Sequence, residues 1–412
     1  MNIKLQMKAL QAAAQPALES DHFIIHFALR NPLKGKGMGS LGVRDRVIIL
    51  TYAEALEALY RTMTSAPWQR EPPVADRTGK THVYVLDNSP FTAHDRNEIP
   101  YIGLSCRSNE PTTQAELHRA AAEAVHEGTH LFNYRERPMH DPNSDVWEWF
   151  DEGLAVLMEM LVASGNPDYF RFLMDWIDVP EMSLDDPEGH YQAGMFIRYL
   201  GKKMGLEFVN KVWMQSEIQE SPLEAIKRMM PSSQKFISAD PNDRDLFASG
   251  YCIDPYFVWD YASSSVAPDV FLRYGERAIS ESKLLSADSP EEITGELNHL
   301  ACRYYRFFLK GDVTRVQLDF KVADPNNTTP FKAEVAVVTK DKRRIAGRYL
   351  YPVESETGVA SHLSTVLDGF DLDDIDHLVL VVSNCGTRTL RQAMGKDNDD
   401  QKQFVITALA FR

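Results

Sequence analysis

The sequence has no long apolar run, no paired-cysteine motif and no excess of basic residues. Its most apolar windows, 47–50 and 378–382, last only a few residues, whereas a membrane helix needs about 20. Against 44 lysines and arginines stand 59 aspartates and glutamates, giving a formal charge of -15. A surface that tracks nucleic-acid phosphates is therefore not expected. These shortages predict a soluble protein that neither spans a membrane nor binds nucleic acid.

The cysteine pattern excludes the usual cysteine-based sites. Cys106, Cys252, Cys302 and Cys385 lie far apart and form no CxxC pair, so buried free thiols are favoured over two disulfides. The first 20 residues lack the apolar core of a signal peptide. The chain as given is therefore interpreted as cytoplasmic. Export, after removal of a leader or by a route that needs no signal, remains the alternative.

The pattern of residues changes along the chain and predicts an α+β protein. A small mixed sheet and several helices are expected first, and short β-rich runs after about residue 302 favour an antiparallel sandwich. The predicted parts are an N-terminal segment (1–20), a subdomain with a β-sheet and a long helix (21–140), a mostly helical subdomain (141–302) and a β-sandwich (303–412).

One predicted helix carries a pattern with chemical meaning. A capping box at 113–116 begins an alanine-rich stretch that contains the HExxH sequence HEGTH at 126–130. His126 and His130 lie about one turn apart on one helix face, so both imidazoles can reach one metal ion. Glu127 lies about 100° around the helix from His126. Its carboxylate can therefore act as a general base without occupying a coordination position.

A catalytic zinc ion needs a third protein ligand and one open position. The candidate ligand is Glu152, within WFDEGLA at 149–155 at the start of the next predicted helix. A carboxylate in this position would lower the net charge of the site to about +1. Glu148, one turn earlier on the same face, is the alternative, but the Gly-Leu-Ala after Glu152 favours Glu152.

HEGTH followed by WFDEGLA resembles the gluzincin metallopeptidases, in which HExxH supplies two histidine ligands and a later (N/D)EG(F/L)A helix supplies a glutamate. The resemblance implies a thermolysin-like catalytic domain over roughly residues 20–215. It also implies one catalytic Zn2+ held by His126, His130 and Glu152. Glu159 matches an acidic position of these enzymes and is expected to hydrogen-bond a ligand histidine.

Further along the chain, YQAG at 191–194 resembles the YxxG helix start of the same enzymes, whose tyrosine hydroxyl stabilises the oxyanion. By resemblance this role falls to Tyr191. His190 is the competitor, because other branches of the group use a histidine there. His118 and His140 are expected to be surface or packing histidines.

The sequence departs from the family at two places, and the second of them narrows the expected activity. Asp151 replaces the usual asparagine before the ligand, and the strand at 101–106 lacks the GxMEN sequence that binds a substrate's free amine in aminopeptidases. An endopeptidase is therefore favoured over an aminopeptidase, with strand 101–106 pairing with an extended peptide.

The predicted function is hydrolysis of a peptide or protein at a zinc site, with Glu127 as general base. One alternative is an inert metal site in a protein that binds its partner through the sandwich. Another is hydrolysis of a non-peptide bond, because HExxH defines the metal chemistry and not the substrate. The oligomeric state stays open.

Overall fold

The computed structural model describes most of the 412 residues. The described ranges are 17–27, 46–86, 89–94, 99–106, 112–136, 144–163, 178–186, 191–217, 220–238, 245–252, 279–287, 289–311, 313–324, 329–340, 344–352, 362–368, 375–387 and 401–412. The chain divides into two compact units, one formed by Met1–Leu173 with His190–Ser216 and the other by Met174–Gly189 with Glu217–Arg412. His140, His190 and most of a helix expected at 270–279 lie outside the described residues.

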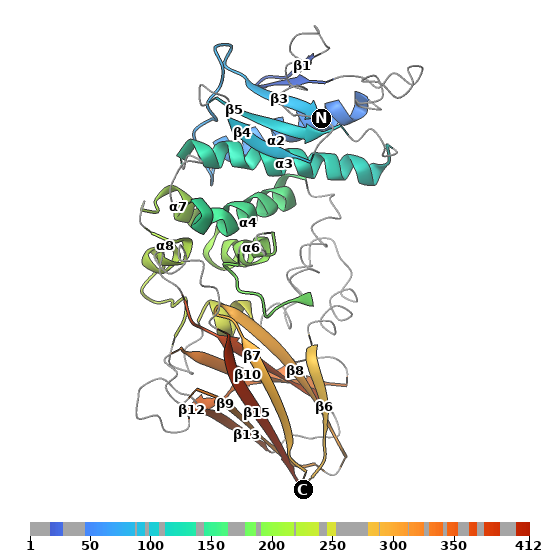
Figure 1. The fold of residues 1–412 in the computed structure, drawn as a ribbon, viewed down its shortest axis with the longest axis vertical. Helices are drawn as coiled ribbons and strands as arrows, with labels where there is room; N and C mark the ends of the chain where they lie inside the picture. The colour runs from blue at the N-terminus through green and yellow to red at the C-terminus, as the bar shows by residue number, and fades with distance from the viewer. Residues whose placement is uncertain are drawn as a thin grey trace. The chain divides into compact units, whose positions relative to one another are not determined.

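The first unit contains a mixed five-stranded sheet (Figure 1) in the order β1-β2-β3-β5-β4. Its strands are β1 (Ala17–Glu19), β2 (Phe23–His26), β3 (Thr81–Leu86), β4 (Phe91–His94) and β5 (Pro100–Ser105). The central strands β2, β3 and β5 run parallel, and β1 and β4 pair antiparallel at the two edges. Apolar runs at 22–29, 82–86 and 101–106 of the sequence predict the three central strands. The edge strands β1 and β4, of three and four residues, are too short to show an alternating pattern.

The prediction that strand 101–106 pairs with a peptide is wrong. β5 is hydrogen-bonded to β3 on one side and to β4 on the other, so it has no free edge. The edge strand next to β5 is β4, and among the described residues it has β5 as its only strand neighbour. An extended peptide could therefore add only beside β4 at this end of the sheet.

Helices form the rest of the first unit. They are α2 (Arg46–Thr64), α3 (Gln114–Glu136), α4 (Ser144–Val162), α6 (Ala193–Met204) and α7 (Leu206–Met214). The long helix α3 contacts β4 and β5 as well as α2 and α4, and Figure 1 shows it lying along the sheet. At its start, Thr113 Oγ1 accepts the backbone N–H of Glu116 at 3.2 Å, whereas the Glu116 carboxylate pairs with Arg119 at 3.0 Å. Half of the expected capping box is thus formed.

Two glycines let α4 and α6 approach closely. A Cβ added to Gly194 would lie 2.5 Å from Val156 Cγ1, and one added to Gly153 would lie 3.1 Å from the backbone carbon of Ala193. Any larger side chain would push the helices apart. Because Gly153 follows Glu152 directly, this contact also fixes the position of the candidate metal ligand.

Replacing Gly194 with valine is expected to destabilise the chain by about 1–3 kcal/mol, because the added methyl groups must displace Val156 or the backbone of α4. Urea denaturation measures the change in free energy of unfolding. Gly311→Ala is the matched control, since nothing lies within 4 Å of an added Cβ at that position. Equal losses in the two variants would contradict the close contact.

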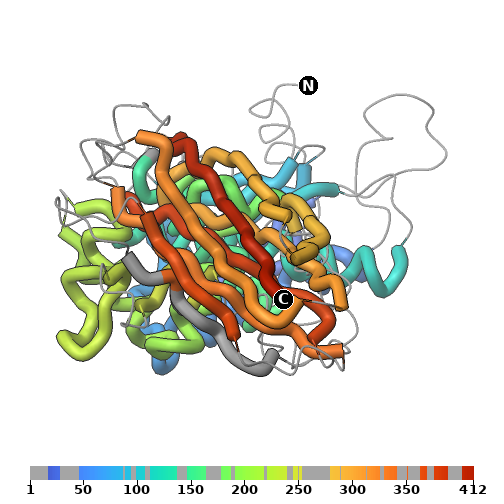
Figure 2. The backbone as a smooth tube through the Cα atoms, turned by 90° about the horizontal axis from the view of Figure 1, so that it is seen from below, coloured from blue at the N-terminus to red at the C-terminus, as the bar shows by residue number. Residues whose placement is uncertain are grey.

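The second unit contains two five-stranded sheets that pack as a sandwich (Figure 2). The first sheet has the order β11-β10-β14-β8-β6 and the second the order β12-β13-β9-β15-β7. The strands are β6 (Ile279–Leu285), β7 (Glu291–Leu297), β8 (Ala301–Leu309), β9 (Arg315–Val322), β10 (Phe331–Thr339), β11 (Arg344–Tyr349), β12 (Tyr351–Pro352), β13 (His362–Asp368), β14 (Ile375–Asn384) and β15 (Lys402–Phe411). All pairs are antiparallel except β6 with β8.

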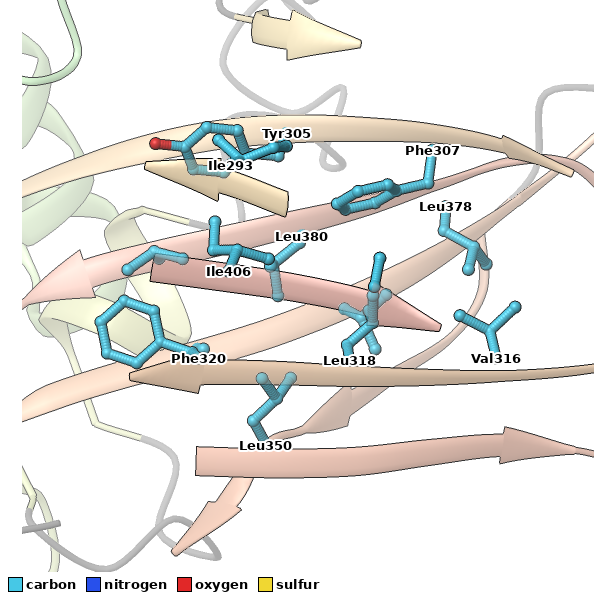
Figure 3. Close-up of a cluster of buried hydrophobic side chains, with 14 of the residues drawn as sticks. Ile293, Tyr305, Phe307, Val316, Leu318, Phe320, Leu350, Leu378, Leu380 and Ile406 are labelled. Atoms are coloured by element: carbon cyan, nitrogen blue, oxygen red, sulfur yellow. The ribbon is translucent and has the colours of Figure 1, made fainter. Parts of the chain in front are cut away.

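Alternate residues of these strands form the buried core between the two sheets. Figure 3 shows Phe307 and Leu380 from the first sheet with Phe320 and Ile406 from the second. These side chains are at most 1% exposed. Burial of such aromatic and aliphatic groups stabilises the sandwich independently of any metal.

Among the described residues the first strand of the sandwich begins at Ile279, earlier than the boundary near residue 302 that the sequence predicted. β6 and β7 are edge strands in which exposed residues alternate with partly or fully buried ones, and most of their residues are polar. Edge strands are often polar because this prevents unwanted pairing, so they give little hydrophobic signal. Residue 302 itself lies inside β8.

The sequence also led to expectations about the cysteines and about membrane-spanning helices. All four cysteines are buried and free, as the spacing predicted. None of the helices in the described part of the chain combines the length and apolarity that crossing a bilayer requires.

Candidate metal centre

Helix α3 presents both histidines of HEGTH on one buried face. The ring centroids of His126 and His130 lie 5.0 Å apart, and their planes make an angle of 76°. The intervening Gly128 faces α2, where an added Cβ would come within 2.6 Å of Leu59 Cδ2. The glycine therefore lets α3 pack closely on α2, while the histidines face α4.

Glu152 on α4 faces both histidines. Its Oε2 lies 2.9 Å from His126 Nε2, and its Oε1 lies 3.6 Å from His130 Nε2. One ligand atom from each of the three residues lies within 4.8 Å of the others, the only such group of metal-binding side chains among the described residues. Glu148 is exposed and does not belong to this group. The donor set of two imidazole nitrogens and one carboxylate fits a Zn2+ ion.

The second nitrogen of each histidine meets another carboxylate. His126 Nδ1 lies 2.7 Å from Glu159 Oε1 in a hydrogen bond, and His130 Nδ1 lies 3.1 Å from Asp151 Oδ1. Both Nε2 atoms consequently face Glu152, and both Nδ1 atoms face away from it. This orientation leaves the two Nε2 atoms as the ligand atoms for one shared ion.

The carboxylates around the histidines favour positive charge at this position. Burial lowers the pKa of His126, but hydrogen bonds to Glu152 and Glu159 outweigh burial and raise that pKa to about 10. The pKa of His130 is likewise raised against burial, by Asp151 and Glu152. Burial raises the pKa of Glu152, yet its contacts with the histidines hold it well below its usual range. A divalent cation can supply the charge that this cluster favours.

Glu127 points to the edge strand and does not belong to the three-residue group. Thr92 Oγ1, on β4, lies 2.8 Å from Glu127 Oε2 and 2.9 Å from the Glu127 carbonyl oxygen. The hydroxyl can donate to either oxygen and ties the carboxylate to β4. The Glu127 carboxylate is therefore held toward β4 and is not one of the three gathered metal-binding groups.

Two tyrosines flank the histidines. The Tyr191 ring centroid lies 5.6 Å from that of His126, and Tyr191 is about half-exposed. Partial burial and the charges of Glu152 and Glu127 raise the Tyr191 pKa to about 12, so its hydroxyl remains a hydrogen-bond donor at neutral pH. Tyr134 stacks on the other side, with its ring centroid 5.8 Å from that of His130.

The sequence did not single out Thr92, Tyr134 or the pairing of Asp151 with His130. Tyr134 follows His130 by four residues and so lies on the same helix face, a spacing that could have revealed it. Thr92 lies on a strand of only four residues, and its contact with α3 depends on the folded sheet. The sequence showed that Asp151 replaces the family's asparagine, but it did not predict the contact of Asp151 with His130.

A second polar cluster, in the other unit, joins Ser183, Asp185 and His299. Ser183 Oγ and Asp185 Oδ1 lie 2.9 and 2.6 Å from the same atom, His299 Nε2. A catalytic triad needs the serine and the aspartate on opposite ring nitrogens. The cluster is therefore structural, and together with the hydrogen bond from Leu184 N to Leu300 O at 3.1 Å it fastens this segment to the sandwich.

The described residues define a mixed α/β protein with sandwich-like C-terminal sheets and a His-His-Glu cluster beside its N-terminal sheet. The chain belongs to DUF6055, a family of unknown function, whose model matches residues 6–243 and so more than half of the sequence. No curated protein matches the chain.

Two similar solved structures are a pre-peptidase C-terminal domain of a collagenase from Bacillus anthracis and PliG, a periplasmic inhibitor of g-type lysozyme from Aeromonas hydrophila. The collagenase domain is 9% identical, with 31% of this chain and 93% of that chain covered and a TM-score of 0.19. The inhibitor is 10% identical, with 32% and 96% covered and a TM-score of 0.18. Neither likeness indicates an activity for this chain.

Proposed function

We propose that this chain is a zinc-dependent peptidase of the gluzincin type, with a thermolysin-like catalytic part formed by the N-terminal sheet and helices α2 to α7. The observation that carries the proposal is the gathering of ligand atoms from His126, His130 and Glu152 within 4.8 Å of one another. Glu127 directly follows His126 in the sequence, but its carboxylate is not one of the three gathered ligand groups. This combination fits a metal site with a general base better than a purely structural ion pair.

A zinc ion at this site would supply Lewis acidity that activates a water molecule and polarises the scissile carbonyl. Glu127 takes the proton of the attacking water and returns it to the leaving amine. Thr92 holds the Glu127 carboxylate in place through its hydroxyl at 2.8 Å. Tyr191, as a neutral phenol, donates to the oxyanion that develops on the substrate.

The edge strand β4 supports an extended peptide as the substrate. Its Thr92 bonds Glu127, so a peptide that adds as a strand beside β4 runs past the general base. Backbone pairing with an edge strand can bind any internal segment of a peptide, and it does not require the peptide's free N-terminal amine. Cleavage within a peptide is therefore favoured over removal of its N-terminal residue.

Incubation of the zinc-loaded chain with a mixed peptide library, analysed by mass spectrometry, tests this function. We expect cuts inside peptides, including peptides with blocked amino termini, and loss of cleavage when a chelator removes the metal. Cleavage confined to free N-terminal residues would contradict the endopeptidase assignment. Binding without cleavage in the zinc-loaded state would favour the alternative, an inert site in a protein that binds its partner.

A further inference from the structure

Three of the four buried cysteines belong to the second unit. Cys302 lies on β8, Cys385 directly follows β14, and Cys252 directly follows the short π-helix η2 (Phe247–Tyr251). Each of the three is at most 2% exposed. Because a buried cysteine can also be a simple packing residue, the contacts of the sulfur atoms decide what these thiols can do.

Cys302 faces away from the core between the two sheets. Ala301 and Tyr305 of β8 belong to that core, and side chains alternate along a strand, so the Cys302 thiol points to the outer face of the first sheet. Its partner on the neighbouring strand is Ser383, and residues directly opposite each other share a face. Another segment of the unit can therefore reach the Cys302 thiol on this outer face.

The segment that ends at Cys252 packs on this outer face. Tyr304 of β8 donates its hydroxyl to the carbonyl oxygen of Cys252, and Cys302 Sγ lies 3.4 Å from the same hydroxyl oxygen. The Cys252 thiol makes hydrogen-bonding contacts with the Cys302 thiol and with the Ser383 side chain. Tyr304 thus holds the backbone of Cys252 at a position where the two thiols meet.

The third thiol of the unit, Cys385, is a less suitable partner. Its Sγ lies 3.8 Å from the carbonyl oxygen of Ser383, and it influences the Cys252 thiol through charge and not through a hydrogen bond. The three sulfur atoms do not form a metal-binding group, because among the described residues only the His-His-Glu cluster gathers ligand atoms closely enough. The arrangement therefore fits a disulfide between two of the thiols better than a thiolate metal site.

We propose that Cys252 and Cys302 form a disulfide when the chain folds in the presence of a small-molecule disulfide such as oxidised glutathione, and that this bond fastens the end of η2 to β8. The thiolate of one cysteine attacks the small disulfide and releases one small thiol. The thiolate of the other cysteine then attacks the mixed disulfide and releases the second small thiol. The two protons and two electrons that the pair loses end on the two released thiols. This inference is independent of the proposed peptidase activity.

Burial determines when the bond can form. It raises the pKa of the Cys252 thiol well above its usual range, and the thiolate is the attacking species. The folded, reduced chain is therefore expected to react slowly with the small disulfide, whereas the exposed thiols of an unfolded chain react readily. The bond forms as the chain folds in an oxidising compartment, and the thiols stay reduced in a reducing one.

Refolding of the full chain from urea, either with a mixture of reduced and oxidised glutathione or with excess reductant, tests the inference. After oxidative refolding we expect two of the four thiols to be lost, and mass spectrometry of proteolytic peptides should find a link between positions 252 and 302. The second unit of the oxidised chain should melt roughly 5–15 °C higher than that of the reduced chain. The reason is that the two cysteines are about 50 positions apart, so the bond restricts the unfolded chain.

Cys106→Ser and Cys385→Ser are the matched controls, because each removes one buried thiol outside the pair. Both variants should still form the link and keep the difference in melting temperature between the two conditions. Cys302→Ser should lose the link and melt at the same temperature in both. If the cysteines only fill space, the unchanged chain should also melt at the same temperature in both conditions.

Retention of all four thiols after oxidative refolding, a link that involves Cys385, or equal melting temperatures in the two conditions would overturn the inference. If the oxidised chain does not refold, the folded chain is incubated with the same glutathione mixture in urea below the unfolding midpoint, where transient opening exposes buried thiols. Absence of the link between Cys252 and Cys302 from that sample would overturn the inference equally.

Discussion

Replacing Glu127 with glutamine is expected to lower peptide hydrolysis by about 100- to 10,000-fold, the usual contribution of a positioned acid-base group. Glutamine keeps the size of the side chain and can still contact Thr92, but its amide cannot take a proton from water. Zinc content should stay near one per chain, because Glu127 lies outside the group of ligand atoms. Initial rates on the best library peptide, with metal analysis of the same sample, measure both effects.

Glu54→Gln is the matched control for this variant, because Glu54 is an exposed carboxylate on α2 of the same unit. Its rate should equal that of the unchanged chain. Turnover retained in Glu127→Gln would rule out this residue as the general base. Loss of zinc from that variant would instead show that Glu127 is a ligand.

Replacing Glu152 with glutamine is expected to weaken zinc binding by more than about 100-fold, a larger loss than removal of an outer partner causes. The change removes the anionic ligand and leaves two neutral imidazoles, which hold a dication poorly. Activity should fall with metal content. Competition with a chromophoric chelator measures the change in zinc affinity directly.

Glu148→Gln decides between the two glutamates of α4 that the sequence left open. Glu148 is exposed, whereas Glu152 reaches His126 Nε2 at 2.9 Å. We therefore expect Glu148→Gln to retain zinc. The reverse result, with zinc lost from Glu148→Gln and kept by Glu152→Gln, would show that Glu148 is the ligand.

The local part of the candidate site could be predicted because it depends on helix geometry. The spacing of four positions from His126 to His130 places both on one face in any α-helix, and the motif around Glu152 identified the next helix. The structure brings these three residues together, and Glu159 hydrogen-bonds His126 as the family resemblance implied.

The supporting contacts could not be predicted, because they join segments far apart in the sequence. Arg70 reaches Asn133 across 63 positions and Asn210 across 140, and no periodic pattern records such pairings. Thr92 reaches Glu127 from a strand too short to be recognised. The edge strands β6 and β7 were not predicted for a related reason. They form by pairing with neighbouring strands and show little hydrophobic pattern of their own.

X-ray absorption at the zinc edge of the zinc-loaded chain tests the central claim most directly. The account predicts one zinc per chain with two imidazole nitrogens and one carboxylate at about 2.0–2.2 Å, and a fourth light-atom ligand from solvent. A sulfur ligand, a shell of oxygens without imidazole, or the same spectrum from a chain with His126→Ala and His130→Ala would contradict it.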